Sequence, residues 1–470
     1  MKDRRWALLA LVGSAYFMTV LDGTSMLAAL PSIRRSLDLT GPALQWTVTA
    51  YALAFGGPLL CCGRAADLLG RGRMFRVGML LRVLASLACG LAPSVGFLVA
   101  ARAVQGCSAA IIAPAALSMV LGAFPEGPER NRALGIWGGL GGVGATAGLL
   151  LGGVLTDALG WPWVFWINVP IGVVVLLLAP ALLPVGRPAG GARSLDVAGA
   201  VTSTVTLSLA VYTIIQLPTA GWLSTRTGLC VAGIGVLATV FLVVERRSAH
   251  PLVPVRLLRS RSLAGGNLLV LVAGMAVDGM LVTLTAYVQQ GMGWSALRFG
   301  LLAAMMTATS VAGALASQRA VTRFGVRAVA IGGAAGLLGA AGLLGAGVLL
   351  VALPDGGAVW LMLVALFAFG AGIGAAAVSG QIAALSGVRT SDSGFAASLV
   401  DACFSLGTAF GAAICTTVAG TAVTVDFAGW RAAFGMVAGF AVVGLLVAVT
   451  WPRPGRAGTR RPDRDLVSSP

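Results

Sequence analysis

The chain has 470 residues, of which 58% are hydrophobic and only 10% are charged, and its mean hydropathy is +0.93. A soluble domain carries about 25% charged residues, so this composition excludes an ordinary soluble protein and indicates an integral membrane protein. The net charge of +16 does not indicate nucleic-acid binding, because the arginines are spread through short loops rather than gathered on one polar domain.

Apolar segments long enough to span a membrane follow one another along the whole chain, since a span needs roughly 20 apolar residues. Fourteen such segments lie near residues 6–30, 44–63, 75–92, 95–121, 133–156, 163–184, 195–216, 225–244, 263–288, 297–318, 327–352, 358–384, 393–420 and 430–452. Lys and Arg gather in alternate connections, which by the positive-inside rule places both termini in the cytoplasm. We therefore predict an all-α, multi-pass protein of the cell (plasma) membrane with 14 transmembrane helices; thirteen would place the termini on opposite sides.

Two polar stretches divide the chain. The Pro- and Gly-rich stretch PVGRPAGGARS follows the sixth predicted span, and the basic stretch ERRSAHPLVPVRLLRSRS follows the eighth. A repeated six-helix half is typical of large transporters. The division predicts a six-helix bundle over residues 1–184, two inserted helices with cytoplasmic linkers over 185–262, a second six-helix bundle over 263–452 and a basic cytoplasmic tail over 453–470.

Residues for enzymatic or metal chemistry are few. The seven cysteines fall in or beside apolar segments without metal-ligand spacing, and the chain has a single histidine. No phosphate-binding Gly-rich loop and no Ser/His/Asp set is visible. We predict no enzymatic activity, no catalytic residues, no metal and no cofactor. A channel or a non-transporting receptor stays open as a different class of function.

Asp22 lies inside the first apolar segment, in the stretch VLDGTSMLAALP. A carboxylate in hydrocarbon is costly and faces a cavity or a partner. Arg102 lies inside the segment at 95–121, and the rise of 1.5 Å per residue places both charges roughly 11–12 Å below the outer ends of their helices. We predict that the two residues pair, as a site that exchanges its cation for a proton. A static structural pair, or an Arg102 that extends to the interface, are the alternatives.

The stretch GRAADLLGRGRMF, at 63–75, is the predicted loop between the second and third spans. Its Asp67 lies four residues before Arg71, close enough for an ion pair, and Gly63 and Gly70 permit close approach and tight turns. The order of Gly, Asp, Gly and paired Arg resembles the signature loop of the major facilitator superfamily. The resemblance implies a latch in which Asp67, with Arg71 and Arg73 as partners, caps a helix of the opposite half. Lipid-facing positive charge would explain the arginines but not Asp67.

The segment at 133–156 is rich in glycine. Small residues at four-residue spacing let helix backbones touch. Gly144, Gly148, Gly152 and Gly153 resemble the motif that marks antiporters of the superfamily, although Leu149 stands where the family has Pro.

The stretch WPWVFWINVPIG, together with LDGTSMLAALP and HPLVPVRLL, resembles the fourteen-helix drug:proton antiporter family over nearly the whole chain, with Pro162 replacing a usual Arg. The resemblance implies a major facilitator fold of two six-helix bundles plus two inserted helices. It also implies a monomer that needs no cofactor and uses the proton gradient as its energy source.

Two further acids lie within predicted spans. Asp278 is in the middle of the segment at 263–288, and Asp401 is in SLVDACFSLG. Acids within the segment at 393–420, where Asp401 lies, occur in some family members and are associated with cationic drugs. Each acid is either a coupling site or a buried acid bonded to a backbone or hydroxyl group.

We therefore expect proton-coupled export of hydrophobic or cationic small molecules such as drugs and antibiotics, with protons and lipid as the other partners and no nucleic acid. Coupling would use Asp22, Arg102, Asp278 and Asp401. The alternative is a dedicated exporter of one natural product that gives self-resistance to its producer.

Overall fold

The computed structural model describes residues 2–37, 41–183, 196–248, 260–294, 296–334, 357–419 and 427–450. Its regular elements are all helices, because the long apolar runs can satisfy their backbone hydrogen bonds in lipid only within each segment. The predicted linker at 184–194, the stretch 249–259, the larger part of the predicted span at 327–352 and the tail at 453–470 lie outside the described residues.

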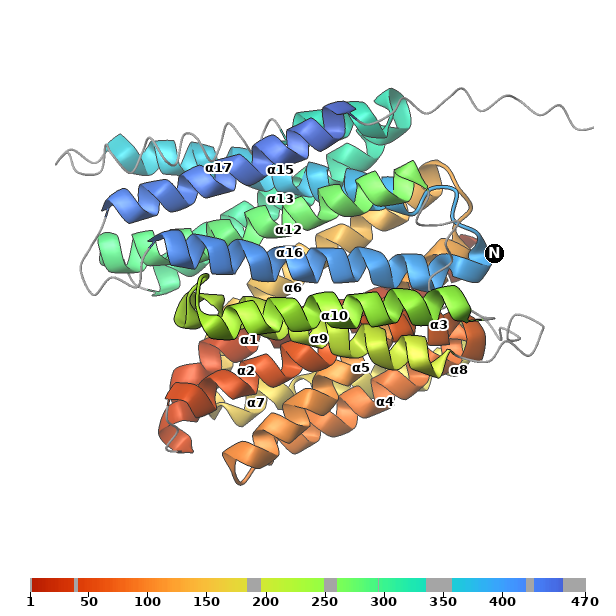
Figure 1. Ribbon diagram of the computed structural model, residues 1–470, viewed down its shortest axis with the longest axis horizontal. Coiled ribbons are helices and arrows are strands. Elements are labelled where there is room, and N and C mark those ends of the chain that lie inside the picture. The colour runs from red at the N-terminus through yellow and green to blue at the C-terminus, as the bar shows by residue number, and fades with distance from the viewer. Residues whose placement is uncertain are drawn as a thin grey trace, which may run out of the picture.

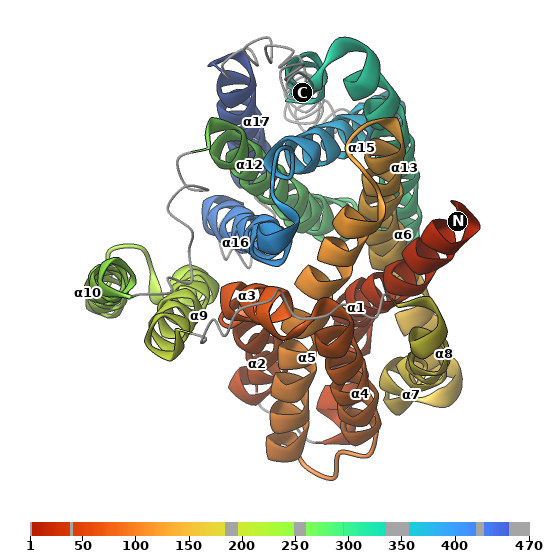
Figure 2. The same cartoon turned by 90° about the vertical axis from the view of Figure 1, so that its right-hand side faces the viewer.

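The helices form two groups that lie side by side (Figure 2). The N-terminal group consists of α1 (Lys2–Ser36), α2 (Gly41–Gly56), α3 (Leu59–Leu69), α4 (Arg71–Gly90), α5 (Val95–Ala123), α6 (Pro128–Leu159), α7 (Pro162–Trp166) and α8 (Asn168–Leu182). The C-terminal group consists of α12 (Arg261–Thr285) with its π-helical continuation Ala286–Gly291, α13 (Ala296–Phe324), α15 (Gly357–Ala384), α16 (Ser393–Ala419) and α17 (Phe427–Thr450). Between them in sequence come α9 (Val197–Ala220) and α10 (Thr225–Arg247).

Within the described residues, 11 helices are long and apolar enough to cross a membrane, or 12 if the bent pair α2 and α3 forms one span. The helix α4 is not among them, since it carries four arginines. Residues 326–334 are also helical and begin the predicted span at 327–352. The described part of the chain is therefore a multi-helix membrane bundle.

The second predicted span differs from the expectation of one straight helix followed by a loop. Helix α2 ends at Gly56, and α3 continues at an angle of 45° after Pro58. A proline has no N–H to continue the helical ladder, which explains the break. Helix α3 then runs to Leu69, so Asp67 lies on a helix, and the predicted loop is reduced to Gly70, whose φ of 98° favours glycine.

The two groups meet along two seams. On one side α6 packs against α13, and on the other α16 packs against α3 and α5 (Figures 1 and 2). Helix α9 lies outside the second seam, against α2, α3 and α16, and α10 packs on α9. The largest buried apolar cluster includes residues of both groups, such as Leu134 and Val378. The two groups therefore share one buried apolar core.

Candidate functional site

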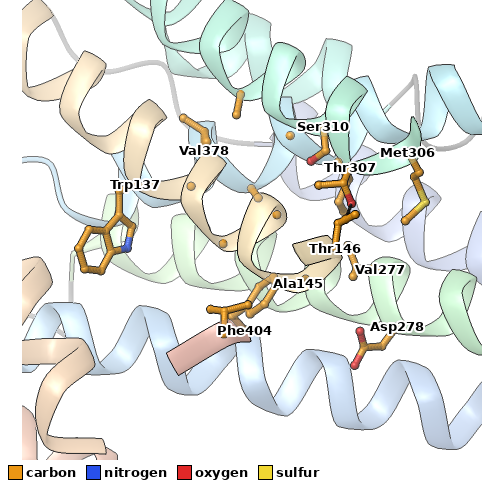
Figure 3. Close-up of a pocket in the computed structure, with 18 of the residues that line it drawn as sticks. Trp137, Ala145, Thr146, Val277, Asp278, Met306, Thr307, Ser310, Val378 and Phe404 are labelled. Atoms are coloured by element: carbon orange, nitrogen blue, oxygen red, sulfur yellow. Dashed lines mark hydrogen bonds between the residues drawn. The ribbon is translucent and has the colours of Figure 1, made fainter. Parts of the chain in front are cut away.

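A cavity of about 340 Å³ lies between the two groups of helices. Its lining comes from α1 and α6 on one side and from α12, α13, α15 and α16 on the other (Figure 3). Most of the lining is apolar, but Asp278 and Asp401 both line it, and no Lys, Arg or His is among its described lining residues. The cavity is therefore an apolar chamber with two acids and no basic side chain.

The N-terminal wall of the cavity combines small and aromatic side chains. Gly138, Gly141 and Gly142 of α6 line it and leave room that larger residues would fill. Tyr16 of α1 stacks on Trp137 of α6, with ring centroids 4.4 Å apart and an interplanar angle of 16°. Such a wall can contact a flat apolar molecule, and aromatic faces also attract cations.

The C-terminal wall carries the two acids. Asp278 of α12 is within hydrogen-bonding reach of Thr408 of α16. Asp401 of α16 differs, because its Oδ2 is buried and has no hydrogen-bond partner in the described parts of the chain. The structure thus brings together two of the predicted intramembrane acids, but not Asp22.

Asp22 lies instead in a separate, fully buried cluster inside the N-terminal group. Its Oδ2 is 2.8 Å from Nη1 of Arg102, so the predicted pair is present in the structure. The same oxygen is 3.2 Å from Nη2 of Arg82 on α4, a partner that was not predicted. Asp22 and Arg82 are 0% exposed and Arg102 is 1% exposed. One carboxylate therefore holds two guanidinium groups away from solvent.

Amide side chains complete the cluster. The other oxygen of Asp22, Oδ1, accepts hydrogen bonds from Nε2 of Gln105 and Nδ2 of Asn168, each at 3.1 Å. Nη1 of Arg102 also donates to Oε1 of Gln105 at 2.8 Å, and its guanidinium carbon lies 4.4 Å from the centre of the Tyr51 ring. Asp22 thereby ties together α1, α4, α5 and α8.

The residues of the predicted latch join α3 to α16 at one end of the second seam. Asp67 accepts hydrogen bonds from the backbone N–H groups of Gly394 (3.0 Å to each oxygen) and Phe395 (3.1 Å). Both residues lie in the first turn of α16, where the helix dipole favours a negative charge. Arg71 Nη2 lies 3.0 Å from Asp67 Oδ1. The expected role of Arg73 as a second partner is not met, since its side chain is exposed and no ion pair joins it to Asp67 among the described residues.

A second set of contacts joins the groups near the latch. Oε1 of Glu126 accepts a hydrogen bond from the backbone N–H of Gly387 at 2.8 Å and one from Nη1 of Arg130 at 3.2 Å. Nη2 of Arg130 donates to the carbonyl of Leu385 at 3.3 Å. Neither Glu126 nor Arg130 was predicted as a functional residue, although an acid four residues before an arginine at a helix start is a visible signal.

The glycine motif of α6 packs directly on α1. A Cβ at Gly144 would lie 3.1 Å from the carbonyl oxygen of Phe17, one at Gly148 2.4 Å from that of Leu21, and one at Gly152 2.7 Å from that of Ser25. These three glycines therefore allow close helix contact. Nothing lies within 4 Å of a Cβ at Gly153, so the contact does not require this glycine.

Helix α6 is continuous from Pro128 to Leu159, and Leu149, where the family has Pro, is a cavity-lining residue.

Among the described residues, no group of His, Cys, Asp and Glu is arranged to hold a metal ion.

The sequence matches the family described as Major Facilitator Superfamily over residues 12–244 and 266–469. It is 37% identical over 426 residues to the puromycin resistance protein pur8 of Streptomyces alboniger, which covers 88% of this chain and 82% of that protein. It is 43% identical over 297 residues to the cephamycin export protein CmcT of Amycolatopsis lactamdurans, covering 62% and 61% of the two chains. It is 32% identical over 419 residues to the multidrug resistance protein Stp of Mycobacterium tuberculosis, covering 88% and 76%.

A solved structure shares the fold. The human organic anion transporter MFSD10 (TETRAN) superposes with a TM-score of 0.65 at 16% sequence identity, over 94% of this chain and 99% of that chain. At this identity the likeness concerns the fold and not the substrate.

Proposed function

The chain belongs to the major facilitator superfamily, and on that premise we propose that it is a proton-coupled exporter of hydrophobic or cationic small molecules. The observation that carries the proposal is the central cavity, which has an apolar lining, two carboxylates and no basic side chain among its described residues. An apolar pocket with a few polar groups suits a drug-sized ligand. Its charge favours a cation over an anion.

The words resistance and export in the names of the relatives support export as the direction of transport. One relative is a puromycin resistance protein, another a cephamycin export protein and a third a multidrug resistance protein. The first two names fit the second candidate, a dedicated exporter of one natural product that protects its producer. The third fits a transporter of broad specificity.

The proposed topology has fourteen transmembrane helices. To the 11 spans found among the described residues it adds the bent pair α2 and α3 as one span, α4, and the helix that begins at residues 326–334. An even number places both termini on the same side of the membrane as the latch, and the Lys and Arg in these connections make that side the cytoplasm. The proposed domains are two six-helix bundles, at 1–184 and 263–452, with two inserted helices between them, in a monomer.

The proposed mechanism alternates access to the cavity between the two faces of the membrane. With Asp67 bound to the start of α16, the cytoplasmic end is held closed, and release of this latch opens it. Substrate enters from the cytoplasm or inner leaflet, and a proton enters from outside. A ligand moves such an equilibrium only by as much as its affinity differs between the two states. An intramembrane carboxylate that holds either a proton or a substrate cation supplies that difference, so the proton gradient is the energy source.

The test uses inverted membrane vesicles with an acidic interior and ethidium as a hydrophobic cation. We expect wild-type vesicles to accumulate ethidium and to lose part of the pH gradient when it is added. The double variant Asp278→Asn, Asp401→Asn should do neither. Wild-type vesicles that behave like vesicles without the protein would contradict the proposal. Accumulation of one compound from a panel of unrelated cations would favour the dedicated exporter.

A further inference from the structure

Two buried polar side chains of the central cavity have N–H groups without a partner. Trp137 of α6 and Gln381 of α15 both line the cavity and are 1% and 8% exposed. Within the described parts of the chain, no hydrogen bond engages the indole N–H of Trp137 or the side-chain amide of Gln381. Buried polar groups in proteins are nearly always hydrogen-bonded. These two groups therefore need a partner that the cavity itself contains.

Other polar side chains of the cavity already have partners. The hydroxyl groups of Thr146 and Thr307 are hydrogen-bonded to each other across the first seam, and Asp278 is within reach of Thr408. Figure 3 shows Thr146, Thr307 and Asp278 at one end of the labelled set and Trp137 at the other. The end of the cavity at Trp137 is thus the one where buried N–H groups are left over.

Trp137 and Gln381 lie at the same end of the cavity. A Cβ at Gly138 of α6 would lie 2.9 Å from Cγ2 of Val378 of α15, so the two helices touch at this point. Trp137 is the residue before Gly138, and Gln381 follows Val378 by almost one helical turn. The stacking of Tyr16 on Trp137 holds the indole ring in one orientation. Each group of helices therefore places one polar side chain at this end.

The chemistry of these two side chains sets what they can bind. An indole offers a single donor and no acceptor, and a glutamine amide offers two donors against one acceptor oxygen. A ligand that satisfies them must supply mainly acceptors, such as carbonyl, ether or hydroxyl oxygens. Because most of the cavity lining is apolar, these oxygens have to be carried on an apolar frame.

We propose that Trp137 and Gln381 determine specificity by donating hydrogen bonds to oxygen atoms of the substrate, so that the cavity prefers an oxygen-bearing apolar cation to an oxygen-free one. The inference rests on the proposed function and specifies its substrate class. Without substrate, water satisfies both side chains, and binding exchanges these bonds for bonds to the substrate oxygens. A substrate without acceptor oxygens displaces the water and leaves the N–H groups unpaired, which lowers its affinity.

The experiment compares the binding of two flat, fluorescent cations of similar size. Berberine carries methoxy and methylenedioxy oxygens, which accept hydrogen bonds, whereas ethidium contains no oxygen. The variants Gln381→Met and Trp137→Phe remove the N–H donors but keep a side chain of similar length or an aromatic ring. Gln318→Met is the matched control, because Gln318 of α13 is also buried, at 6% exposure, but is not among the described lining residues of the cavity.

Each purified protein is passed through size exclusion, and the fluorescence change of the bound cation gives its Kd. Wild type and Gln318→Met should bind berberine more tightly than ethidium. Gln381→Met and Trp137→Phe should each raise the Kd for berberine about tenfold, the effect of a lost hydrogen bond, and change the Kd for ethidium by about twofold at most. Either variant alone tests the inference if the other fails to fold.

An equal loss of affinity for both cations would overturn the inference, because it would show that the residue acts through packing. Unchanged berberine affinity in a folded variant would overturn the role of that residue, since water would then be its only partner. A wild type that binds ethidium at least as tightly as berberine would overturn the preferred substrate class and leave the proposed function standing. A wild type that binds neither cation, in vesicles that accumulate neither, would instead refute the proposed function.

Discussion

Asp67 of α3 and Gly394 of α16 are 327 residues apart in sequence, yet each carboxylate oxygen of Asp67 lies 3.0 Å from the backbone nitrogen of Gly394. The contact satisfies a backbone N–H group at the start of α16 that has no partner within its own helix. It also places a negative charge at the positive end of the helix. The two groups of helices are thus joined by an interaction that is lost when they separate at this end.

Asp67→Asn should favour the state in which the latch is open. The amide keeps one acceptor but loses its charge and its ion pair with Arg71. Hydrogen bonds to charged groups contribute about 1.5–3 kcal/mol, so the closed population should fall by one to two orders of magnitude relative to the open one. Electron–electron distance measurements between spin labels on α3 and α16 would follow this shift. Asp157→Asn is the control, and an unchanged distance distribution in Asp67→Asn would contradict the prediction.

Gly63→Ala should open the same latch without changing any charge. A Cβ at Gly63 would lie 2.4 Å from Oγ of Ser398 and 2.6 Å from the carbonyl oxygen of Gly394, so α3 and α16 would have to move apart. The same distance measurement is expected to show a broader, longer distribution. Gly96→Ala, where nothing lies within 4 Å of the new Cβ, is the matched control. A distance distribution in Gly63→Ala like that of the wild type would show that the seam between α3 and α16 tolerates the methyl group.

Gly148→Ala should destabilise the packing of α6 on α1, whereas Gly153→Ala should not. The first methyl group would lie 2.4 Å from the backbone carbonyl of Leu21, and the second meets nothing within 4 Å. Overpacking of this kind costs typically about 1–3 kcal/mol. Thermal unfolding in detergent, followed by tryptophan fluorescence, should therefore show a lower Tm for Gly148→Ala alone. Equal Tm values for the two variants would argue against the close helix contact.

Asp22→Asn and Arg82→Met should differ sharply in stability. Removing the charge of Asp22 leaves two buried guanidinium groups without a counter-charge, and breaking a buried pair in this way costs about 3–5 kcal/mol. Replacing Arg82 leaves a one-to-one pair of Asp22 with Arg102 and is expected to be nearly neutral. The yield of monodisperse protein after heating, measured by size exclusion, separates the two. A larger loss for Arg82→Met than for Asp22→Asn would contradict the interpretation that Asp22 is the counter-charge of both arginines.

The depth of charged residues along their helices was the most informative signal in the sequence for the Asp22 cluster. It predicted that Asp22 and Arg102 meet, and they do. The same rise of 1.5 Å per residue places Arg82 about 12 Å from the end of α4 at Gly90, at a similar depth. Arg82 lies within the predicted span at 75–92, but the sequence indicated only Arg102 as the partner of Asp22 and gave Arg82 no role.

Other features depend on tertiary contacts that the sequence does not encode locally. The pairing of Asp67 with the start of α16 follows from the family resemblance, but the exposure of Arg73 depends on how α4 rotates after Gly70. The presence of Asp278 and Asp401 in one cavity depends on the packing of α12 against α16. Helical periodicity fixes the positions of residues along one helix, whereas the relative orientation of two helices depends on the packing of the whole bundle.

Helix α9 touches both groups of helices and belongs to neither. A Cβ at Gly57, the residue after α2, would lie 2.1 Å from Oγ of Ser208. On the other side, Ile214 and Leu217 pack on Ala413, and Trp222, just after α9, donates a hydrogen bond to Thr417 at 3.3 Å. Any relative rotation of the two groups must therefore change at least one of these contacts. Because α10 packs on α9 outside the bundle, a fluorophore on α10 would report the switching of the protein from its periphery, without touching the cavity.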